Sequence, residues 1–583
     1  MQMDLTAAAA AARRAADDDT PLSPAKRAAE LKRRSTDRSE SVVPPSSAPK
    51  LHCTFSAKLV DLMSNFSVVD AEAESEGAAA AEAGFYAASA GAPEAPAVAV
   101  AVAAASDDAS SGVSESAALC PVPEGAAFAA EDEASGPAPP SAAPAPALPP
   151  LPAAAGLASV FESYGARSIA SAAPADVAAA VRAHLKEHPA VCLDTLYAYD
   201  LAQVARMHAA WIAALPRVTP YYAVKCNPEP ALLAVLEALG CGFDCASQVE
   251  LSAVVARMGV APGRVIFANP SKRPADIAFA RKLGVERTTF DTECELLKIA
   301  AAYPSAGCVL RLRCDDAGAQ VQLGLKYGAE PHEVPGLLAA AKRLGLRVVG
   351  VSFHVGSGVR NYGVYAEAVR RARAAFDAAA AMGFHEMALL DVGGGFVAPH
   401  APGPAAAFVA SAAAINSALE AHFPEAEWPH LQIISEPGRY FAESAATLVA
   451  PVYSIRHRTV EGAAAGEVAR RDYWITDGLY GSFNCILYDD QHPTFRVMRS
   501  PCLPPVGRGA DAQAHASAVW GPTCDSADCV YNDCALPELR VGDCLVFSNA
   551  GAYTVAGACD FNGLPFCNPR KLFVASRSPA PTA

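Results

Sequence analysis

Three side chains capable of covalent or acid–base chemistry each stand at the end of a short apolar run. Lys225 follows the run Thr219–Val224, Glu436 follows Leu431–Ser435, and His354 ends a third run. A lysine amine that is removed from water has a lowered pKa and becomes a nucleophile. Each residue alone also has an ordinary explanation, namely a lysine extending into solvent or a histidine in the core. Their recurrence at strand-like ends favours one shared site.

Groups suited to an anion stand beside these three residues. Three consecutive glycines run from Gly393 to Gly395, Ser357 lies in a second glycine-containing turn, and Arg439 follows shortly after the glutamate. Exposed amides of such turns approach anions closely, and a guanidinium binds phosphate through a fork of donors. A lysine, a histidine, a glutamate and a phosphate cradle together fit a cofactor attached through lysine, which is pyridoxal 5′-phosphate.

The elements that must position these residues are strands alternating with helices. Such alternation predicts parallel βα units, and the number of units suits a closed (β/α)8 barrel over residues 200–445. Residues 156–199 and 446–575 are predicted to form a mostly-β domain. The expected strands are Thr219–Val224, Val265–Ala268, Cys308–Leu312, Arg347–His354, Ala388–Val392, Leu431–Ser435, Asp472–Thr476, Cys544–Phe547 and Lys571–Val574, and the expected helices are Pro230–Leu239, Pro274–Leu283 and Tyr362–Met382.

Residues 1–155 have a different composition from the rest of the chain. They contain 10 Lys and Arg against 21 Asp and Glu, so they carry −11 of the net charge of −15. They are also rich in alanine and proline, which predicts a disordered extension. The acidic balance argues against nucleic-acid and membrane-surface binding, and the chain has no run of 18 apolar residues. Basic residues near the start leave plastid targeting open beside a cytoplasmic location.

The 17 cysteines are scattered at irregular spacings. We therefore expect free thiols in a reducing compartment rather than a disulfide framework. Cys524, Cys529 and Cys534 are the nearest approach to a zinc-binding pattern, but paired units and a fourth ligand are missing. No metal site is predicted.

Several motifs resemble those of one known family, the eukaryotic ornithine decarboxylases, which belong to the alanine-racemase-like class of pyridoxal phosphate enzymes. The similarity runs from about residue 193 to residue 574, and the first 155 residues have no counterpart in it. The motifs are Tyr222-Ala-Val-Lys-Cys-Asn227, His354-Val-Gly-Ser-Gly358, Gly393-Gly-Gly-Phe396, Glu436-Pro-Gly-Arg-Tyr440, Tyr480-Gly-Ser-Phe-Asn484, Trp520-Gly-Pro-Thr-Cys-Asp525 and Gly551-Ala-Tyr-Thr554.

The resemblance implies a role for each matched residue. Lys225 would bind the cofactor covalently, Glu436 would keep the pyridine nitrogen protonated, and His354 would stack on the ring. Asp244 and Arg311 would lie near the attached lysine and the ring. The remaining cofactor-binding residues implied are Ser357, Gly393, Gly394, Gly395, Pro437, Gly438, Arg439 and Tyr553.

The resemblance also implies the reaction and its substrate. L-Ornithine would lose CO2 to give putrescine, the first step of polyamine biosynthesis, with Cys524 donating a proton to the α-carbon. Asp489, Asp525 and the adjacent Tyr488 would receive the distal ammonium group. In the family, Cys524 and Asp525 reach the neighbouring subunit, so a homodimer with shared sites is expected.

Two alternatives remain open at this stage. Lysine or another basic amino acid could be the substrate, because one methylene is discriminated by only about 1–3 kcal/mol. A non-catalytic relative resembling the antizyme inhibitors is the other alternative, and an antizyme-like regulator is a further partner to consider. Asp490, Ser435 and Val397 depart from the common family residues at their positions, but none of the three replaces a catalytic position.

Overall fold

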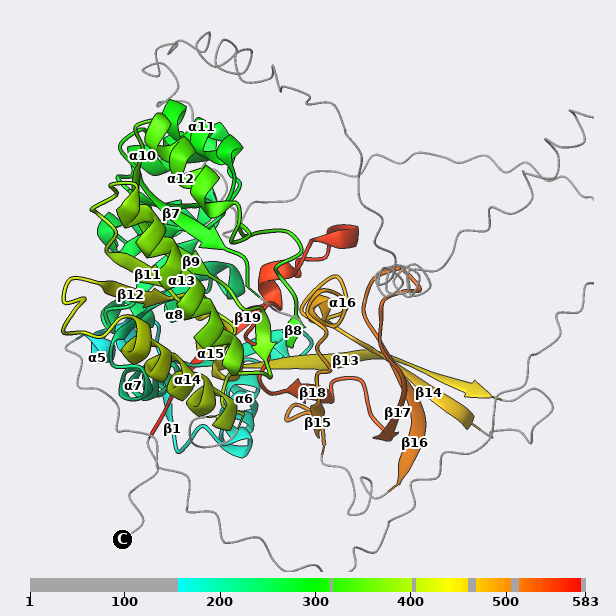
Figure 1. Ribbon diagram of the computed structural model, residues 1–583. Coiled ribbons are helices and arrows are strands. Elements are labelled where there is room, and N and C mark those ends of the chain that lie inside the picture. Colours follow the sequence, from blue (N-terminus) through cyan, green and yellow to red (C-terminus); the bar gives the residue numbers. More distant parts are fainter. Residues whose placement is uncertain (1–155, 315–317, 401–404, 460–467, 505–512, 578–583) are drawn as a thin grey trace, which may run out of the picture. The chain divides into compact units, whose positions relative to one another are not determined.

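The computed structural model describes residues 156–314, 318–400, 405–459, 468–504 and 513–577 (Figure 1). The expectation of a disordered extension over residues 1–155 lies outside these residues. Within the described part of the chain, none of the helices combines the length and the apolar composition that spanning a membrane requires.

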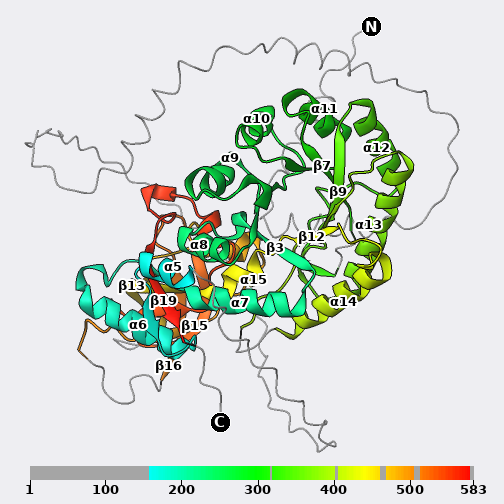
Figure 2. The same cartoon turned by 90° about the vertical axis from the view of Figure 1, so that its left-hand side faces the viewer.

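Eight parallel strands close into a barrel, which confirms the predicted fold class. The strands follow the ring order β11-β12-β3-β4-β5-β6-β7-β9, and every neighbouring pair is parallel. Figure 2 shows helices arranged around these strands. The strand bounds are β3 Val218–Ala223, β4 Gly242–Cys245, β5 Val265–Phe267, β6 Arg287–Phe290, β7 Gly307–Leu312, β9 Arg347–Phe353, β11 Leu389–Asp391 and β12 Gln432–Ser435.

Helices α8 to α14 lie between successive barrel strands, α7 precedes the first strand and α15 follows the last, and local sequence signals fix where several of them begin. Side-chain oxygens of Asp200, Ser247 and Thr292 accept backbone N–H groups at the first turns of α7, α9 and α11, as preferred N-cap residues do. The helix bounds are α7 Leu201–Ala214, α8 Pro230–Ala238, α9 Gln248–Leu251, α10 Pro274–Lys282, α11 Glu293–Ala302, α12 Val334–Arg343, α13 Gly363–Ala381, α14 Ala406–His422 and α15 Arg439–Ala442.

The sequence pattern missed two of the eight barrel strands, β4 and β6. β4 is only four residues long and contains a charged residue, Asp244, while β6 reads Arg-Thr-Thr-Phe. Neither sequence is a continuous apolar run, yet Thr288 and Thr289 are buried. Burial on both faces comes from closure of the barrel, which a local pattern cannot register.

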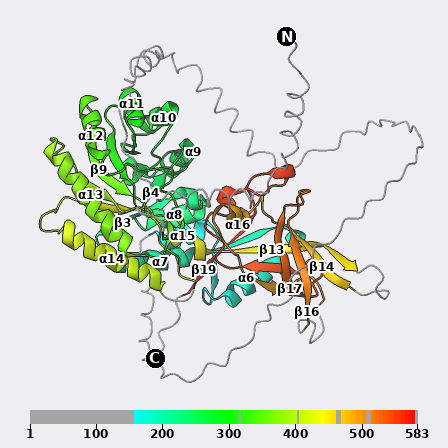
Figure 3. The ribbon, with the colours of Figure 1, turned by 45° about the vertical axis from the view of Figure 1, so that its right-hand side comes forward.

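The second sheet contains nine strands from the two ends of the described chain. Its main path is β1-β19-β2-β13-β14-β16-β17, with β18 pairing to β13 and β15 pairing to β18. Figure 3 shows the long strands β13 and β14 beside β16 and β17. The bounds are β1 Arg167–Ile169, β2 Leu196–Asp200, β13 Ala446–Thr459, β14 Val468–Ile475, β15 Phe495–Met498, β16 Ala514–Trp520, β17 Cys529–Pro537, β18 Cys544–Phe547 and β19 Arg570–Ser576.

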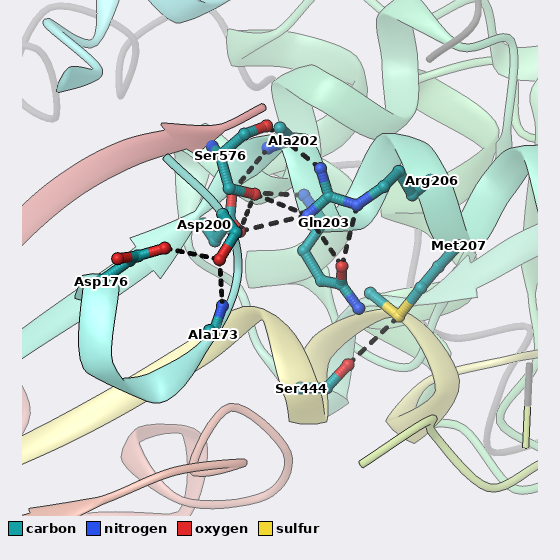
Figure 4. A network of polar contacts seen from close by, with 10 residues as sticks. Ala173, Asp176, Asp200, Ala202, Gln203, Arg206, Met207, Ser444 and Ser576 are labelled. Carbon is teal, nitrogen blue, oxygen red and sulfur yellow. Dashed lines mark hydrogen bonds and ion pairs between the residues drawn. The ribbon is translucent and has the colours of Figure 1, made fainter. Parts of the chain in front are cut away.

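A buried polar network joins the last strand of this sheet to the first barrel helix (Figure 4). Arg206 of α7 donates to the carbonyl and the hydroxyl of Ser576, at 3.1 and 2.6 Å. The guanidinium also lies 3.3 Å from Asp200, and the Asp200 carboxylate accepts the Ser576 backbone N–H at 3.1 Å. All three residues are at most 5% exposed, so the network satisfies groups that water cannot reach.

One cysteine pair departs from the expectation of free thiols. The structure joins Cys192 to Cys502, which are 310 residues apart. Both sulfur atoms lie 3.5 Å from the carbonyl oxygen of Leu185, so the same helix end brings the two chain segments together. Irregular spacing along the sequence carries no information about such a long-range approach.

Candidate active site

The first chemically capable pair is Lys225 and Asp244. Lys225 lies in the single turn Val224–Cys226 directly after β3, and Asp244 lies on the neighbouring strand β4. The lysine Nζ donates to the Asp244 Oδ2 at 2.5 Å, and the Asp244 side chain is fully buried. Adjacent strand ends therefore place an amine against a carboxylate at the mouth of the barrel.

The prediction that desolvation lowers the lysine pKa is wrong for this structure. Burial does lower the pKa of Lys225, but the negative charges of Asp244 and Glu436 outweigh that effect and raise it above its usual value. The amine is therefore held as an ammonium by its carboxylate neighbours. It must lose a proton before it can act as a nucleophile.

Glu436 and Asp391 add two further buried carboxyl groups beside this pair. Burial raises the pKa of Asp391 to about 7. Burial, together with the charges of Asp391 and Asp244, also raises the pKa of Glu436 well above its usual value. The Oδ1 of Asp244 and the Oδ2 of Asp391 are buried without a hydrogen-bond partner among the described residues. Such unpaired oxygens are suited to a bound cation or donor.

Asp391 was not singled out from the sequence, although it belongs here by geometry. Its Oδ1 accepts the backbone N–H of Gly393 at 2.9 Å, which shapes the start of the triple-glycine turn. The available signal was its position at the end of β11, immediately before that turn.

His354 lies directly after β9 and is held in its neutral form. Burial, with the positive charges of Arg311 and Lys225, lowers its pKa well below the usual value. Its Nδ1 accepts the backbone N–H of Gly356 at 3.1 Å, which fixes the ring orientation. A neutral imidazole can lie against an aromatic ring without adding charge to it.

The glycines expected to cradle a phosphate leave no room for side chains. A Cβ at Gly394 would lie 2.8 Å from His354 Nε2, and one at Gly395 would lie 2.4 Å from the Gly356 carbonyl oxygen. Gly393 and Gly395 also have φ values of 69° and 101°, which favour glycine. The turn is therefore packed tightly against neighbouring protein atoms, and only glycine fits at Gly394 and Gly395. Ser357 begins β10, Ser357–Val359, which pairs with β8, Ala319–Val321.

Gly438 and Tyr553 form a second part of this cradle. A Cβ at Gly438 would lie 3.1 Å from the Tyr553 hydroxyl. The Tyr553 backbone N–H donates to the Cys226 carbonyl at 3.0 Å, and Tyr553 has a φ of 52°, which is unusual for a residue with a side chain. The neighbouring Pro437 accepts the backbone N–H of Ala223 at 3.2 Å, which ties this turn to β3.

The structure pairs two residues that the sequence analysis assigned to different ligands. The Arg439 guanidinium forms a short ion pair with the Asp489 carboxylate, and it lies 3.4 Å from Glu443. It also lies 5.4 Å from the centre of the Tyr553 ring. Before Arg439 can bind a phosphate or Asp489 a substrate ammonium, this ion pair must open or share its partners, because both groups are buried.

The other expected substrate residues lie away from the barrel residues. Tyr488, the last residue of α16 (Asn484–Tyr488), is 76% exposed. The Asp525 carboxylate accepts a short hydrogen bond from Tyr480, and the backbone N–H of Cys524 donates to Asn562 at 3.0 Å. In the described part of the chain, no hydrogen bond or ion pair links Cys524 or Asp525 to Lys225 or to its carboxylate neighbours.

The residues at the barrel mouth fit pyridoxal phosphate. An amine is available for covalent attachment, two buried carboxylate oxygens lack hydrogen-bond partners among the described residues, and a tight glycine turn lies beside His354. A closed βα barrel with this set of residues at its strand ends defines a pyridoxal-phosphate-dependent enzyme of the alanine-racemase-like fold.

Comparison with known proteins shows which family within this class the chain belongs to. The family model described as the pyridoxal binding domain of pyridoxal-dependent decarboxylases matches residues 201–443. Ornithine decarboxylase of Rattus norvegicus is 43% identical over 66% of this chain and 81% of its own length. A chloroplastic ornithine decarboxylase of Nicotiana glauca is 45% identical over 63% of this chain and 81% of its own length. The chain belongs to the ornithine decarboxylase family of pyridoxal-phosphate-dependent decarboxylases.

Two further similar proteins have other described functions. Antizyme inhibitor 2 of Xenopus laevis is 42% identical over 64% of this chain and 79% of its own length. The crystal structure of an arginine decarboxylase from Paramecium bursaria Chlorella virus, bound to agmatine, matches with a TM-score of 0.61 and 35% identity, over 68% of this chain and 100% of its own.

Proposed function

We propose that this protein decarboxylates L-ornithine to putrescine and CO2 with bound pyridoxal phosphate. The observation that carries the proposal is the complete set of reactive residues in a chain of this family. Lys225, Glu436 and Arg439 are at the barrel mouth, and Cys524 and Asp525 are present in the connection between β16 and β17. Carboxylates rather than cations at the substrate positions favour an amino acid with a distal positive charge.

The barrel residues would bind and orient the reactants. Lys225 would attach the cofactor through its amine, and the glycine turns with Arg439 and Tyr553 would hold the phosphate. When bound, pyridoxal phosphate supplies an electron sink, which accepts the electron pair of the bond between the substrate α-carbon and its carboxylate. Glu436 would become ionised beside the protonated pyridine nitrogen, because a nearby positive charge lowers a carboxyl pKa. Cys524 would then deliver a proton to the substrate α-carbon.

An assay of CO2 release tests the substrate assignment. Ornithine, lysine, arginine and diaminopimelate are compared at equal concentration, with and without added pyridoxal phosphate. Ornithine should have the highest kcat/KM, and lysine should follow because it differs by one methylene, a difference of about 1–3 kcal/mol. A higher kcat/KM for another amino acid would reject the assignment. Release that does not depend on the cofactor would reject the mechanism.

The non-catalytic alternative is disfavoured by the same residues. An antizyme-inhibitor-like protein has no need for an attached lysine or for a carboxylate at the pyridine nitrogen, yet Lys225 and Glu436 are both present, and Lys225 is hydrogen-bonded to Asp244. Absence of any cofactor-dependent CO2 release would favour this alternative. An antizyme-like regulator as a partner is compatible with either activity, and the basic residues Arg281 and Lys282 of α10 offer a surface for it.

We further propose that the working form is a homodimer with shared active sites. Cys524 and Asp525 contact Tyr480 and Asn562 rather than the barrel residues, so a second copy would bring its own pair to this barrel. Mixing inactive Lys225→Ala and Cys524→Ala proteins tests this directly. Shared sites should restore about a quarter of the wild-type activity, since half of the random dimers carry one intact site of two. No recovery after subunit exchange would contradict the sharing.

We also propose a cellular compartment for this protein. We place the protein in the cytoplasm, with the plastid as the alternative that the chloroplastic relative raises. A fluorescent fusion to the C-terminus of the full chain, compared with one lacking residues 1–155, separates the two locations. Plastid import that depends on those residues would reject the cytoplasmic location.

A further inference from the structure

The end of helix α6, Pro174–Glu187, brings together two histidines and a glutamate. His184, Glu187 and His188 are spaced at i, i+3 and i+4, which places them on one side of a helical turn. One nitrogen or oxygen atom of each residue lies within 4.8 Å of the corresponding atoms of the other two. The two imidazole rings are 4.7 Å apart between their centres. None of these residues belongs to the candidate active site.

The donor atoms match the preference of a borderline transition-metal ion. Imidazole nitrogens and carboxylate oxygens bind Zn²⁺ at roughly 2.0–2.2 Å, which puts neighbouring tetrahedral ligands about 3.4 Å apart. Atoms within 4.8 Å of one another need only modest side-chain rotation to reach that separation. Three protein ligands leave the fourth position to water.

The surroundings keep the histidines available as ligands. The Nδ1 atom of His184 is buried and has no hydrogen-bond partner in the described structure. A metal binds imidazole through such an unpaired ring nitrogen.

One existing contact competes with metal binding. The Arg167 guanidinium of β1 lies 2.7 Å from the Glu187 carboxylate, and their side chains are 37% and 53% exposed. An ion pair this exposed contributes only about 0–1 kcal/mol, so a divalent cation can displace it. Val177, Val181 and Leu185 of the same helix are buried in a separate apolar cluster, which anchors α6 beside the histidines.

We propose that His184, Glu187 and His188 form a binding site for a divalent transition-metal ion of the Zn²⁺ type. The cysteine spacing did not predict this site, because its ligands are histidines and a glutamate. The bound ion would link the last turn of α6 to the residue that follows it. Because the site holds no sulfur, its ligand set also distinguishes it from binding by the chain's many thiols.

Titration of the holoenzyme with Co²⁺, followed by absorption spectroscopy, tests the site. Cobalt bound by nitrogen and oxygen gives weak visible bands, whereas thiolate ligands add intense near-ultraviolet charge-transfer bands. The wild-type protein should bind one more equivalent without the thiolate bands than His184→Ala/His188→Ala. The matched control His332→Ala/His430→Ala removes two exposed imidazoles elsewhere and should behave as wild type. Equal stoichiometry in the wild-type and His184→Ala/His188→Ala proteins would overturn the proposal.

Two single variants separate a true ligand set from general histidine binding. Glu187→Gln should weaken Co²⁺ binding at least tenfold, whereas Arg167→Ala should strengthen it because the competing ion pair is gone. Zn²⁺ should raise the melting temperature of the wild-type protein but not that of His184→Ala/His188→Ala, since an ion bound only to the native state stabilises that state. If Glu187→Gln binds Co²⁺ as tightly as the wild-type protein, Glu187 is not a ligand and the proposed site is wrong.

Discussion

At the scale of single residues, Cys524 determines which product forms after CO2 has left, because it is the proposed donor of the proton to the substrate α-carbon. Cys524→Ala should slow ornithine turnover by about 10²-fold or more and shift the product from putrescine toward an aldehyde, because the proton donor is lost. Product analysis by mass spectrometry measures both effects. Cys294→Ala, which removes another exposed thiol, is the matched control and should leave both unchanged. Normal turnover with putrescine as the only product in Cys524→Ala would remove the donor role.

Asp391, a second single residue, makes the stability of the folded protein depend on pH. Burial raises its pKa to about 7 from an unfolded value of 3.8, so between about pH 4 and pH 7 the folded protein binds more protons than the unfolded chain. Stability contributed by this group therefore falls as pH rises through that window. In cofactor-free protein, the melting temperature of Asp391→Asn relative to wild type should rise between pH 5 and pH 8, by an amount equivalent to about 1 kcal/mol or more. A difference independent of pH would contradict the buried carboxyl group.

At the scale of elements, the turn after β11 must remain free of side chains. Gly394→Ala would place a methyl group 2.7 Å from the Glu436 carbonyl and 2.8 Å from His354 Nε2, so pyridoxal phosphate affinity should fall at least about tenfold. Gly336→Ala in α12 is the control, since nothing lies within 4 Å of its new Cβ, and it should stabilise the helix by about 0.5–1 kcal/mol. Fluorescence titration with pyridoxal phosphate measures the affinity of both variants. An unchanged affinity in Gly394→Ala would contradict the role of this turn in binding the cofactor phosphate.

The strands and their ends differ in how far they could be predicted from the sequence. The strand ends that carry Lys225 and Glu436 were predictable, because short apolar runs and turn residues are local signals. β6 was not predictable, because its threonines are buried only through barrel closure. Two electrostatic features were also not predictable from the sequence, namely the ion pair between Arg439 and Asp489 and the raised pKa of Lys225. Each depends on charged residues that are separated along the chain and come together only in the folded protein.

At the scale of the whole molecule, the network around Arg206 holds the barrel to the nine-stranded sheet. Arg206→Met would leave Asp200 buried without its cationic partner and should lower the free energy of unfolding by about 3 kcal/mol. Arg577→Ala, which removes only an exposed contact to Ser168, should change it by less than about 0.5 kcal/mol. Urea denaturation measures both variants. Equal stability would show that the network is dispensable.

The position of β19 has a consequence for how this chain is made. β19 lies between β1 and β2, so a strand near the end of the described chain fills a gap between two strands near its beginning. During synthesis, those two strands leave the ribosome long before their shared neighbour exists, and their edges remain unpaired meanwhile. The chain is therefore most vulnerable to aggregation during translation, and a message truncated before residue 570 would yield a product that cannot close its sheet.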